Sequence, residues 1–377
     1  MGQHITLPQV FKSLFGQAEL ASILKKYGYR DTARKFTVLE LLKFFVAAAV
    51  GEWESYRESE EQLAGRSDIV RSDHSTLSKK AKELPYFISK EVFHRLISKC
   101  NRKTRRLLKL PVTLYADDST SVTVGEGRLP WAAFHGKRSG IKLHFRFDIG
   151  NRMPCRAEES TAREHDSRMA EKLLPDEPEG IDVWDRAYFD LKRLDSWDQA
   201  GRWFVMRIRS NTVLSNPKAL RRWPVDDSNV VEDVTAVLGC EAKQTQRRFR
   251  VVTFLDSKGN FIRVATNLVF LSAETIAAIY KERWQIELFF RWIKQHLNVK
   301  RLFGTSPNAV YNQLYGALIA YVLLRWLYQE AKPTWRCVNL SFTDFLRKLR
   351  LGQLPTEVAY SLVQLLSTRR CLLLNIG

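Results

Sequence analysis

The chain has 377 residues, 45% hydrophobic and 27% charged, which is enough for roughly two to three domains with sizeable cores. A disordered tail and a short peptide are therefore excluded. Lysine and arginine number 60 against 41 aspartate and glutamate, a formal net charge of +19. Such an excess favours a polyanionic partner, because cations near phosphates release condensed counterions. Nucleic acid is the first candidate and a membrane surface the second.

Cysteine spacing and hydropathy narrow the class of protein further. The five cysteines are widely separated, odd in number and without a C-x-x-C pair, which argues against a disulfide framework and a zinc knuckle. This usage fits a reducing cytoplasm. The N-terminus lacks the basic start and compact apolar run of a signal peptide. The most apolar stretch, residues 309–324, contains Asn312 and Gln313, so it predicts a buried helix instead of a membrane span.

The first 110 residues are predicted to be helical, because apolar residues recur at spacings of three and four in FTVLELLKFFVAAAV and ISKEVFHRLISKC. Between these segments, Ser75 or Thr76 can cap a short basic helix. The lysines of that helix are Lys79, Lys80 and Lys82. Two interpretations stay open for it and for the basic run NRKTRRLLK at 101–109, namely contact with DNA or a solvated charged face.

From residue 111 the pattern changes to alternating and β-branched residues, which predicts three successive strands. Helical and strand patterns then alternate through residue 210 and give the order βββαβαβ, the layout of a ribonuclease H-like core. Residues 211–270 are β-rich and contain a hairpin around the turn DSKGN. A helix from Ala273 to Leu297 and further helices from residue 308 follow.

Two acidic residues come at the ends of apolar strands in this core. Asp118 ends the strand VTLYADD, and Asp185 ends the strand GIDVWD. A carboxylate at the carboxyl end of a strand faces a cleft, where its oxygens suit a hard cation such as Mg²⁺. Asp117 points to the opposite face, so Asp118 is favoured as the ligand and Asp117 stays the alternative. Both sites can instead be aspartates that cap backbone amides.

The helix predicted around residues 280–294 carries a polar stripe beside an apolar one. At about 100° per residue its polar residues share an arc of roughly 80°. They are Tyr280, Arg283, Glu287, Arg291 and Lys294. A glutamate among cations is often an intrahelical ion pair. The tyrosine on the same arc and the surplus of cations favour phosphate binding instead.

Asp118, Asp185 and Glu287 together form a carboxylate set from three separate segments, able to hold two divalent ions about 3.5 to 4 Å apart. Such ions serve phosphodiester chemistry, in which one activates the attacking oxygen and the other stabilises the leaving 3′-oxygen. The sequence offers no comparable site. Its seven histidines are scattered, and it has neither a glycine-rich phosphate loop nor a G-x-S-x-G elbow.

One spacing resembles the signature of a known family. Tyr280-x2-Arg283-x3-Glu287-x6-Lys294 resembles the YREK motif of bacterial insertion-sequence transposases, specifically the insertion sequence 4 family of DDE transposases. Asp118 in DDST and Asp185 in WDRAYFD resemble the first two acidic motifs of that family, and REHDS at 163–167 agrees with it. The resemblance covers about residues 110–300, including the β-rich segment before the third acid.

What this resemblance implies is cut-and-paste transposition of an insertion sequence, by an enzyme that is a DNA endonuclease and a strand transferase. By analogy, Asp118, Asp185 and Glu287 are catalytic and bind two Mg²⁺ ions, for which Mn²⁺ can substitute. Water cleaves at the transposon end, and the freed 3′-hydroxyl attacks the opposite strand to form a hairpin. Hairpin opening and strand transfer into target DNA follow.

The resemblance also implies DNA contacts. The predicted DNA-binding residues are Tyr280, Arg283, Arg291 and Lys294 on the helix and Lys137 and Arg138 in the loop FHGKRSGIK. That loop, which also includes His135 and Lys142, can grip the DNA backbone, although an exposed basic loop needs no ligand. In characterised relatives an aromatic residue of the β-rich segment stacks on a flipped base. The candidates here are Trp223, Phe249, Phe254 and Phe261, each of which can equally be a packing residue.

The predicted fold is α/β, with a mixed sheet flanked by helices. Its parts are a helical DNA-end-binding domain (1–110), the first part of a ribonuclease H-like core (111–210), a β-rich insertion (211–270), the core helix with the third acid (271–300) and a helical C-terminal region (301–377). The implied partner is double-stranded DNA, at the transposon ends and in the target, bound by a homodimer at the bacterial nucleoid. Two other functions fit the same residues: a nuclease without strand transfer, and a transposase-derived DNA-binding protein that is no longer catalytic.

Overall fold

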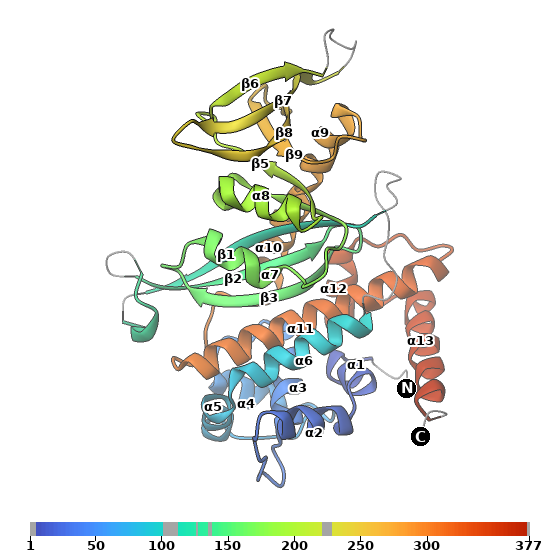
Figure 1. Cartoon of the computed structure of the whole chain (residues 1–377). Helices are drawn as coiled ribbons and strands as arrows, with labels where there is room; N and C mark the ends of the chain where they lie inside the picture. Colours follow the sequence, from blue (N-terminus) through green and yellow to red (C-terminus); the bar gives the residue numbers. More distant parts are fainter. Residues whose placement is uncertain (1–4, 101–111, 126, 135–137, 221–227, 375–377) are drawn as a thin grey trace. The chain divides into compact units, whose positions relative to one another are not determined.

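The computed structural model describes residues 5–100, 112–125, 127–134, 138–220 and 228–374. The polypeptide divides into two compact units, each built from segments that are separate in sequence. The helical unit comprises Met1–Arg102, Val122–Gly140 and Phe290–Gly377, and the sheet unit comprises Lys103–Ser121 and Ile141–Phe289. Figure 1 labels the helices and strands of both.

The helical unit begins with α1 (Leu7–Leu14), α2 (Gln17–Lys26), α3 (Val38–Gly51), α4 (Tyr56–Ala64), α5 (His74–Glu83) and α6 (Tyr86–Cys100). The long helix α11 (Pro307–Ala331) packs along α6 and α3, and nearly all of its residues are buried. A helix covered on every side is apolar around its whole circumference, so the predicted buried helix is confirmed. Within the described residues, no helix is long and apolar enough to cross a membrane.

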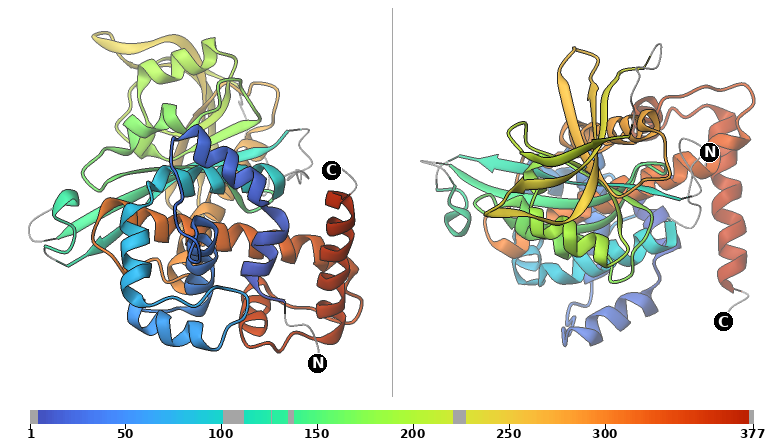
Figure 2. Two further views of the ribbon diagram at one scale, coloured as in Figure 1. Left: turned by 90° about the horizontal axis from the view of Figure 1, so that it is seen from below. Right: turned by 45° about the horizontal axis from the view of Figure 1, so that its top comes forward.

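Two further helices, α12 (Phe342–Arg350) and α13 (Thr356–Leu374), complete the helical unit. Helix α13 contacts α11 and α1. Figure 2 shows it running across the direction of α11 in both views.

Helix α5 begins differently from the prediction. Its N-cap is Asp73, whose carboxylate accepts a hydrogen bond from the backbone N–H of Thr76 at 2.9 Å. The prediction of Ser75 or Thr76 as the cap was therefore wrong. The Asp73 carboxylate satisfies a free amide of the first turn and carries a negative charge near the positive end of the helix dipole.

The three lysines of α5 do not share one environment. Lys79 and Lys82 are exposed, whereas Lys80 is buried and its Nζ lies 2.5 Å from Oδ1 of Asp31. Only two of the three are therefore available to a ligand. The basic run at 101–109 lies outside the described residues.

The sheet unit is organised by one nine-stranded mixed sheet in the order β3-β2-β1-β4-β5-β9-β8-β7-β6. Its strands are β1 (Leu114–Val124), β2 (Ser139–Asp148), β3 (Met153–Thr161), β4 (Ile181–Trp184), β5 (Trp203–Arg207), β6 (Leu214–Ala219), β7 (Val230–Cys240), β8 (Lys243–Leu255) and β9 (Phe261–Thr266). Helix α7 (Asp166–Leu173) precedes β4, and α8 (Leu191–Gln199) precedes β5. The predicted order βββαβαβ for residues 111–210 is confirmed.

Strands β1, β4 and β5 are parallel neighbours, whereas β9 pairs with β5 in the antiparallel sense. The strands of residues 211–270 therefore continue the same sheet beyond β5. The predicted hairpin is present, because β8 and β9 pair antiparallel around residues 256–260. Gly259 in that turn has a φ of +79°, a conformation that side chains other than glycine rarely adopt.

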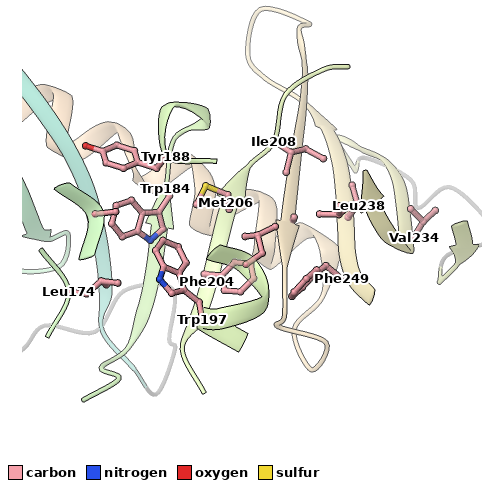
Figure 3. Close-up of a cluster of buried hydrophobic side chains, with 14 residues drawn as sticks. Leu174, Trp184, Tyr188, Trp197, Phe204, Met206, Ile208, Val234, Leu238 and Phe249 are labelled. Atoms are coloured by element: carbon pink, nitrogen blue, oxygen red, sulfur yellow. The ribbon is translucent and has the colours of Figure 1, made fainter. Parts of the chain in front are cut away.

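Helices cover both faces of this sheet. On one face, Trp184 of β4, Trp197 of α8, Phe204 of β5 and Phe249 of β8 form one buried core (Figure 3). On the other face, Phe254 of β8 lies with its ring 6.1 Å from that of Tyr280. The buried core is thus shared between β4, β5, β7, β8 and β9. Trp184 is a packing residue, as predicted.

The helix predicted from Ala273 to Leu297 is two helices, α9 (Ala273–Glu282) and α10 (Trp284–His296). The prediction was wrong at Arg283, whose backbone N–H donates to the carbonyl oxygen of Tyr280 at 3.2 Å, three residues back. This bond tightens the chain into a turn of the 3₁₀ type. The apolar periodicity continues across the break, so the sequence gives no sign of it.

Strand β2 contains a histidine that is shielded from solvent. The side chain of His144 is fully buried, and its Nε2 lies 2.8 Å from Oγ of Ser160 on β3. The Asp166 carboxylate lies 3.7 Å from Nδ1, yet burial prevails and lowers the pKa of His144 to about 4. The unfolded chain, with a histidine pKa of about 6.5, binds a proton between about pH 6.5 and 4 that the folded chain does not bind.

We therefore expect stability to fall as the pH drops through this window, with His144 contributing at most about 3 kcal/mol of the loss. Replacing His144→Gln should remove that part of the pH dependence, measured by urea unfolding at a series of pH values. The exposed His165 offers a control, since His165→Gln should keep the wild-type dependence. An unchanged profile in His144→Gln would contradict the assignment.

Candidate active site

The register of β1 and β4 brings two acids side by side. Asp117 lies opposite Trp184 in this parallel pair, so the next residues, Asp118 and Asp185, are neighbours at the carboxyl edge of β4. The prediction that Asp118 ends its strand was wrong, because β1 continues to Val124. Strand β2 continues beside it, and only the pairing with β4 stops here. Asp118 therefore lies where the sheet opens, as a ligand at a strand end would.

Arg207 is a neighbour of Asp185 that the sequence reasoning missed. Trp184 pairs with Met206 of β5, which places Arg207 next in register to Asp185, with Nη1 at 3.8 Å from Oδ1. The hydroxyl of Tyr280 donates to the same oxygen at 3.4 Å. A lone arginine after an apolar strand has no distinctive spacing. Only the parallel pairing of β4 with β5 could have indicated that Arg207 lies beside Asp185.

Arg283 joins the first and third predicted acids. Its Nη1 donates to Oδ2 of Asp118 at 3.0 Å, and its Nη2 donates to Oε1 of Glu287 at 2.5 Å. The other oxygen of Asp118, Oδ1, accepts the backbone N–H of Ser119 at 2.8 Å. The ion pair between Arg283 and Glu287 that the sequence left open is therefore present. The same guanidinium also reaches a strand 165 residues away in the chain.

Electrostatics connect all three acids. Burial raises the pKa of Asp118 to about 6, although Arg283 acts to lower it, and the negative charges of Asp185 and Glu287 raise it further. Carboxylates that lie close together in a partly buried site disfavour each other's ionisation. Asp118, Asp185 and Glu287 thus form one acidic site, in which Arg283 bridges Asp118 and Glu287 and Arg207 lies beside Asp185.

Asp117 belongs to a different group on the opposite face of β1. Its side chain is fully buried, and its Oδ2 lies 3.4 Å from Nη1 of Arg146 on β2. The same Nη1 lies 2.6 Å from Oδ1 of Asp182 on β4. Burial raises the pKa of both aspartates. Between the two alternatives left by the sequence, the structure puts Asp118 beside Asp185 and Glu287.

The other predicted DNA-binding residues lie on three segments. Arg291 and Lys294 follow Glu287 on α10 by four and seven residues, and burial lowers the pKa of Lys294. Arg138 is exposed just before β2. Lys137, like His135, lies outside the described residues.

Lys142 is not a loop residue. It lies on β2, and its Nζ is 3.0 Å from Oδ1 of Asp166. The prediction of a loop position was wrong because the strand begins at Ser139. Its charge is therefore already paired.

The aromatic candidates differ in exposure. Phe249 and Phe254 are buried in the sheet unit, whereas 66% of Phe261 is exposed. Trp223 lies outside the described residues. Packing therefore accounts for the first two, and Phe261 stays a candidate for stacking.

The chemistry of the donor set decides whether these residues suit a metal. In the described part of the chain, no group of three histidine, cysteine, aspartate or glutamate residues is arranged to hold a metal ion. The Arg283 guanidinium lies between Asp118 and Glu287 and pairs with both carboxylates. Carboxylate oxygens are the donors that hard divalent cations prefer. The donor types therefore suit such ions, whereas in this structure two of the three carboxylates are paired with Arg283.

Comparison with known proteins identifies the family. A family model described as "Transposase DDE domain" matches residues 113–323. The chain belongs to the DDE transposase family. Its relatives include the probable transposase for insertion sequence element IS5377 of Geobacillus stearothermophilus, 46% identical over 357 residues that cover 95% of this chain and 94% of the relative.

Two further relatives are named for insertion sequence 4. A protein of Synechocystis sp. named for insertion sequence element IS4SA is 26% identical and covers 87% of this chain and 98% of the relative. Transposase InsG for insertion sequence element IS4 of Escherichia coli is 25% identical and covers 54% of this chain and 48% of the relative. The resemblance drawn from the YREK spacing is confirmed, and so is the prediction of a transposase.

The buried group around Arg146 yields a stability prediction. We expect Arg146→Met to lower the free energy of unfolding by about 3 to 5 kcal/mol, because it leaves two buried carboxyl groups without their cation. Urea unfolding near neutral pH measures this change. In the control Arg168→Met, the lost pair is exposed and should cost less than about 1 kcal/mol. Equal stability of the two variants would show that Arg146 does not hold these strands.

Proposed function

We propose that the protein is a divalent-metal-dependent transposase that cuts an insertion sequence out of duplex DNA and joins it to a target. The observation that carries this proposal is the arrangement of the three acids: Arg283 bridges Asp118 and Glu287, and Asp185 comes next to Asp118 in strand register and raises its pKa. Family membership supports it, because the matched region contains all three acids. The strand order β3-β2-β1-β4-β5 supports a ribonuclease H-like core, with β6 to β9 as the insertion.

In this proposal the three carboxylates hold two Mg²⁺ or Mn²⁺ ions. Bound ions would activate the attacking oxygen and stabilise the leaving 3′-oxygen in an in-line displacement. Arg283, displaced from Asp118 and Glu287, is then free to bind a phosphate oxygen with its planar fork. Tyr280 and Arg207 lie beside Asp185 and would contact the phosphate on that side.

The first test removes one carboxylate. We expect Glu287→Gln to abolish metal-dependent cleavage at the transposon ends while binding to those ends persists, because the amide keeps the shape and loses the charge. Cleavage of labelled end duplexes in Mg²⁺ and a mobility-shift assay measure the two properties. As a matched control, Glu171→Gln changes an exposed glutamate on α7 and should retain cleavage.

Cleavage that survives Glu287→Gln would contradict the proposed role of this acid. The wild-type products separate the remaining functions. Joined products support a transposase, cuts without joining support a nuclease, and end binding without cleavage supports a protein that no longer catalyses.

We also propose that the helical unit binds the transposon ends as one subunit of a homodimer, through α5. A groove of about 580 Å³ lies beside this helix, and its lining includes hydroxyl and cationic side chains. The polar members are Ser55, Arg57, His74, Ser75, Ser78, Lys79 and Lys82. Hydroxyl and cationic groups together suit phosphate oxygens and base edges.

The lysines of α5 provide the test. We expect Lys82→Gln to weaken end binding and to reduce the dependence of log K on log salt by about one, since one phosphate contact is lost. The control Lys26→Gln removes the same charge from α2, where Lys26 pairs with Glu91, and should leave the salt slope unchanged. Equal salt slopes for wild type and Lys82→Gln would place the DNA contact elsewhere.

A further inference from the structure

The motif REHDS contains an acid that the proposed chemistry does not use. Asp166, in the first turn of α7, directs one carboxylate oxygen towards β1 and β2. Its Oδ1 accepts a hydrogen bond from Oγ of Ser119 at 2.9 Å and another from Nζ of Lys142 at 3.0 Å. Nδ1 of His144 lies 3.7 Å from the same oxygen. Three side chains from two strands therefore surround a single oxygen atom.

This arrangement is not the usual role of an acid at a helix start. An aspartate that caps its helix accepts hydrogen bonds from the backbone amides of the first turn. The contacts of Asp166 described above come from side chains of other elements instead. Lys142 also donates to the carbonyl oxygen of Glu164 at 2.9 Å, which ties the start of α7 to β2. The carboxylate is therefore built into the strands.

Ser119 connects this group to the acidic site. Its hydroxyl is held by Asp166, and its backbone N–H donates to Oδ1 of Asp118 at 2.8 Å. With Oδ1 fixed, the second oxygen of Asp118 is the one that contacts Arg283. Two hydrogen bonds, both made by Ser119, therefore connect Asp166 on α7 to Asp118. Partners that orient a metal-binding carboxylate contribute strongly to metal affinity.

We propose that Asp166 is a positioning residue, which holds the Asp118 carboxylate through Ser119 in the orientation that a divalent cation requires. This inference rests on the proposed function, since it assigns Asp118 to the metal. Asp166 itself does not touch the cation or the DNA. Lys142 holds the same carboxylate oxygen that accepts the hydrogen bond from Ser119.

The test measures metal binding directly, with Mn²⁺ as the probe and the full chain as the sample. Free Mn²⁺ is followed by its electron paramagnetic resonance signal during titration of the wild type, Ser119→Ala, Asp166→Asn and Glu287→Gln. We expect Ser119→Ala and Asp166→Asn to bind Mn²⁺ about tenfold more weakly than the wild type. End binding without metal should be unchanged, because neither residue contacts DNA.

Two controls separate positioning from general damage. Ser119→Thr keeps the hydroxyl and should retain wild-type Mn²⁺ affinity, and Glu171→Gln changes another acid of α7 without effect. The double variant Ser119→Ala/Asp166→Asn should be no weaker than the weaker single variant, because both changes break one path. If Asp166→Asn does not fold, the pair Ser119→Ala and Ser119→Thr still decides the question.

Wild-type Mn²⁺ affinity in Ser119→Ala, together with weakened binding in Glu287→Gln, would overturn this inference and leave the proposed metal site intact. If Glu287→Gln also binds Mn²⁺ normally, the metal site itself is wrong and the inference fails with it. A loss in Ser119→Ala that Ser119→Thr does not show supports the inference.

Discussion

The repulsion among three carboxylates in one partly buried pocket is the constraint on which the site depends. Removing a carboxylate from water is costly, and each nearby negative charge adds to the cost. The pKa of Asp118 is raised to about 6 because burial and the neighbouring negative charges disfavour its ionised form. Arg283 offsets this cost by pairing with Asp118 and Glu287 at once. The fold therefore keeps together charges that would separate in water, an arrangement typical of sites that bind cations.

Two ionic groups lie on opposite faces of β1 because neighbouring residues of a strand alternate. Asp117 faces Arg146 and Asp182 within the sheet, where all three side chains are almost completely buried. Asp118 faces Arg283, and 22% of its side chain is accessible. Arg146 is enclosed by the sheet, whereas Arg283 is more accessible and, in the proposed function, exchanges its carboxylates for phosphate. The consecutive aspartates thus belong to a buried ionic group on one face and to the proposed ligand site on the other.

Much of this could be predicted from the sequence, and the failures have physical causes. Local periodicity predicted the order of strands and helices, and the spacing of four residue types predicted the family. The alternation rule separated Asp117 from Asp118 but could not say which faces the cleft, since that depends on the partner strands. Arg207 was missed because its position beside Asp185 depends on the register between β4 and β5, which the sequence does not reveal. The break at Arg283 was missed because apolar periodicity continues through a single tightened turn.

That break explains how a segment between the second and third acids affects the site. Helix α9 packs on β7, β8 and β5, and Tyr280 near its end contacts the ring of Phe254 on β8. Arg250 of β8 donates to the carbonyl oxygens of Leu268 and Leu271 just before α9, so the sheet fixes where the helix starts. The chain then passes through the tight turn at Arg283 into α10 and Glu287. The position of the third acid is therefore set by β6 to β9, whose strands share a core with β4 and β5, and a change in that core would reach the carboxylates through one short helix.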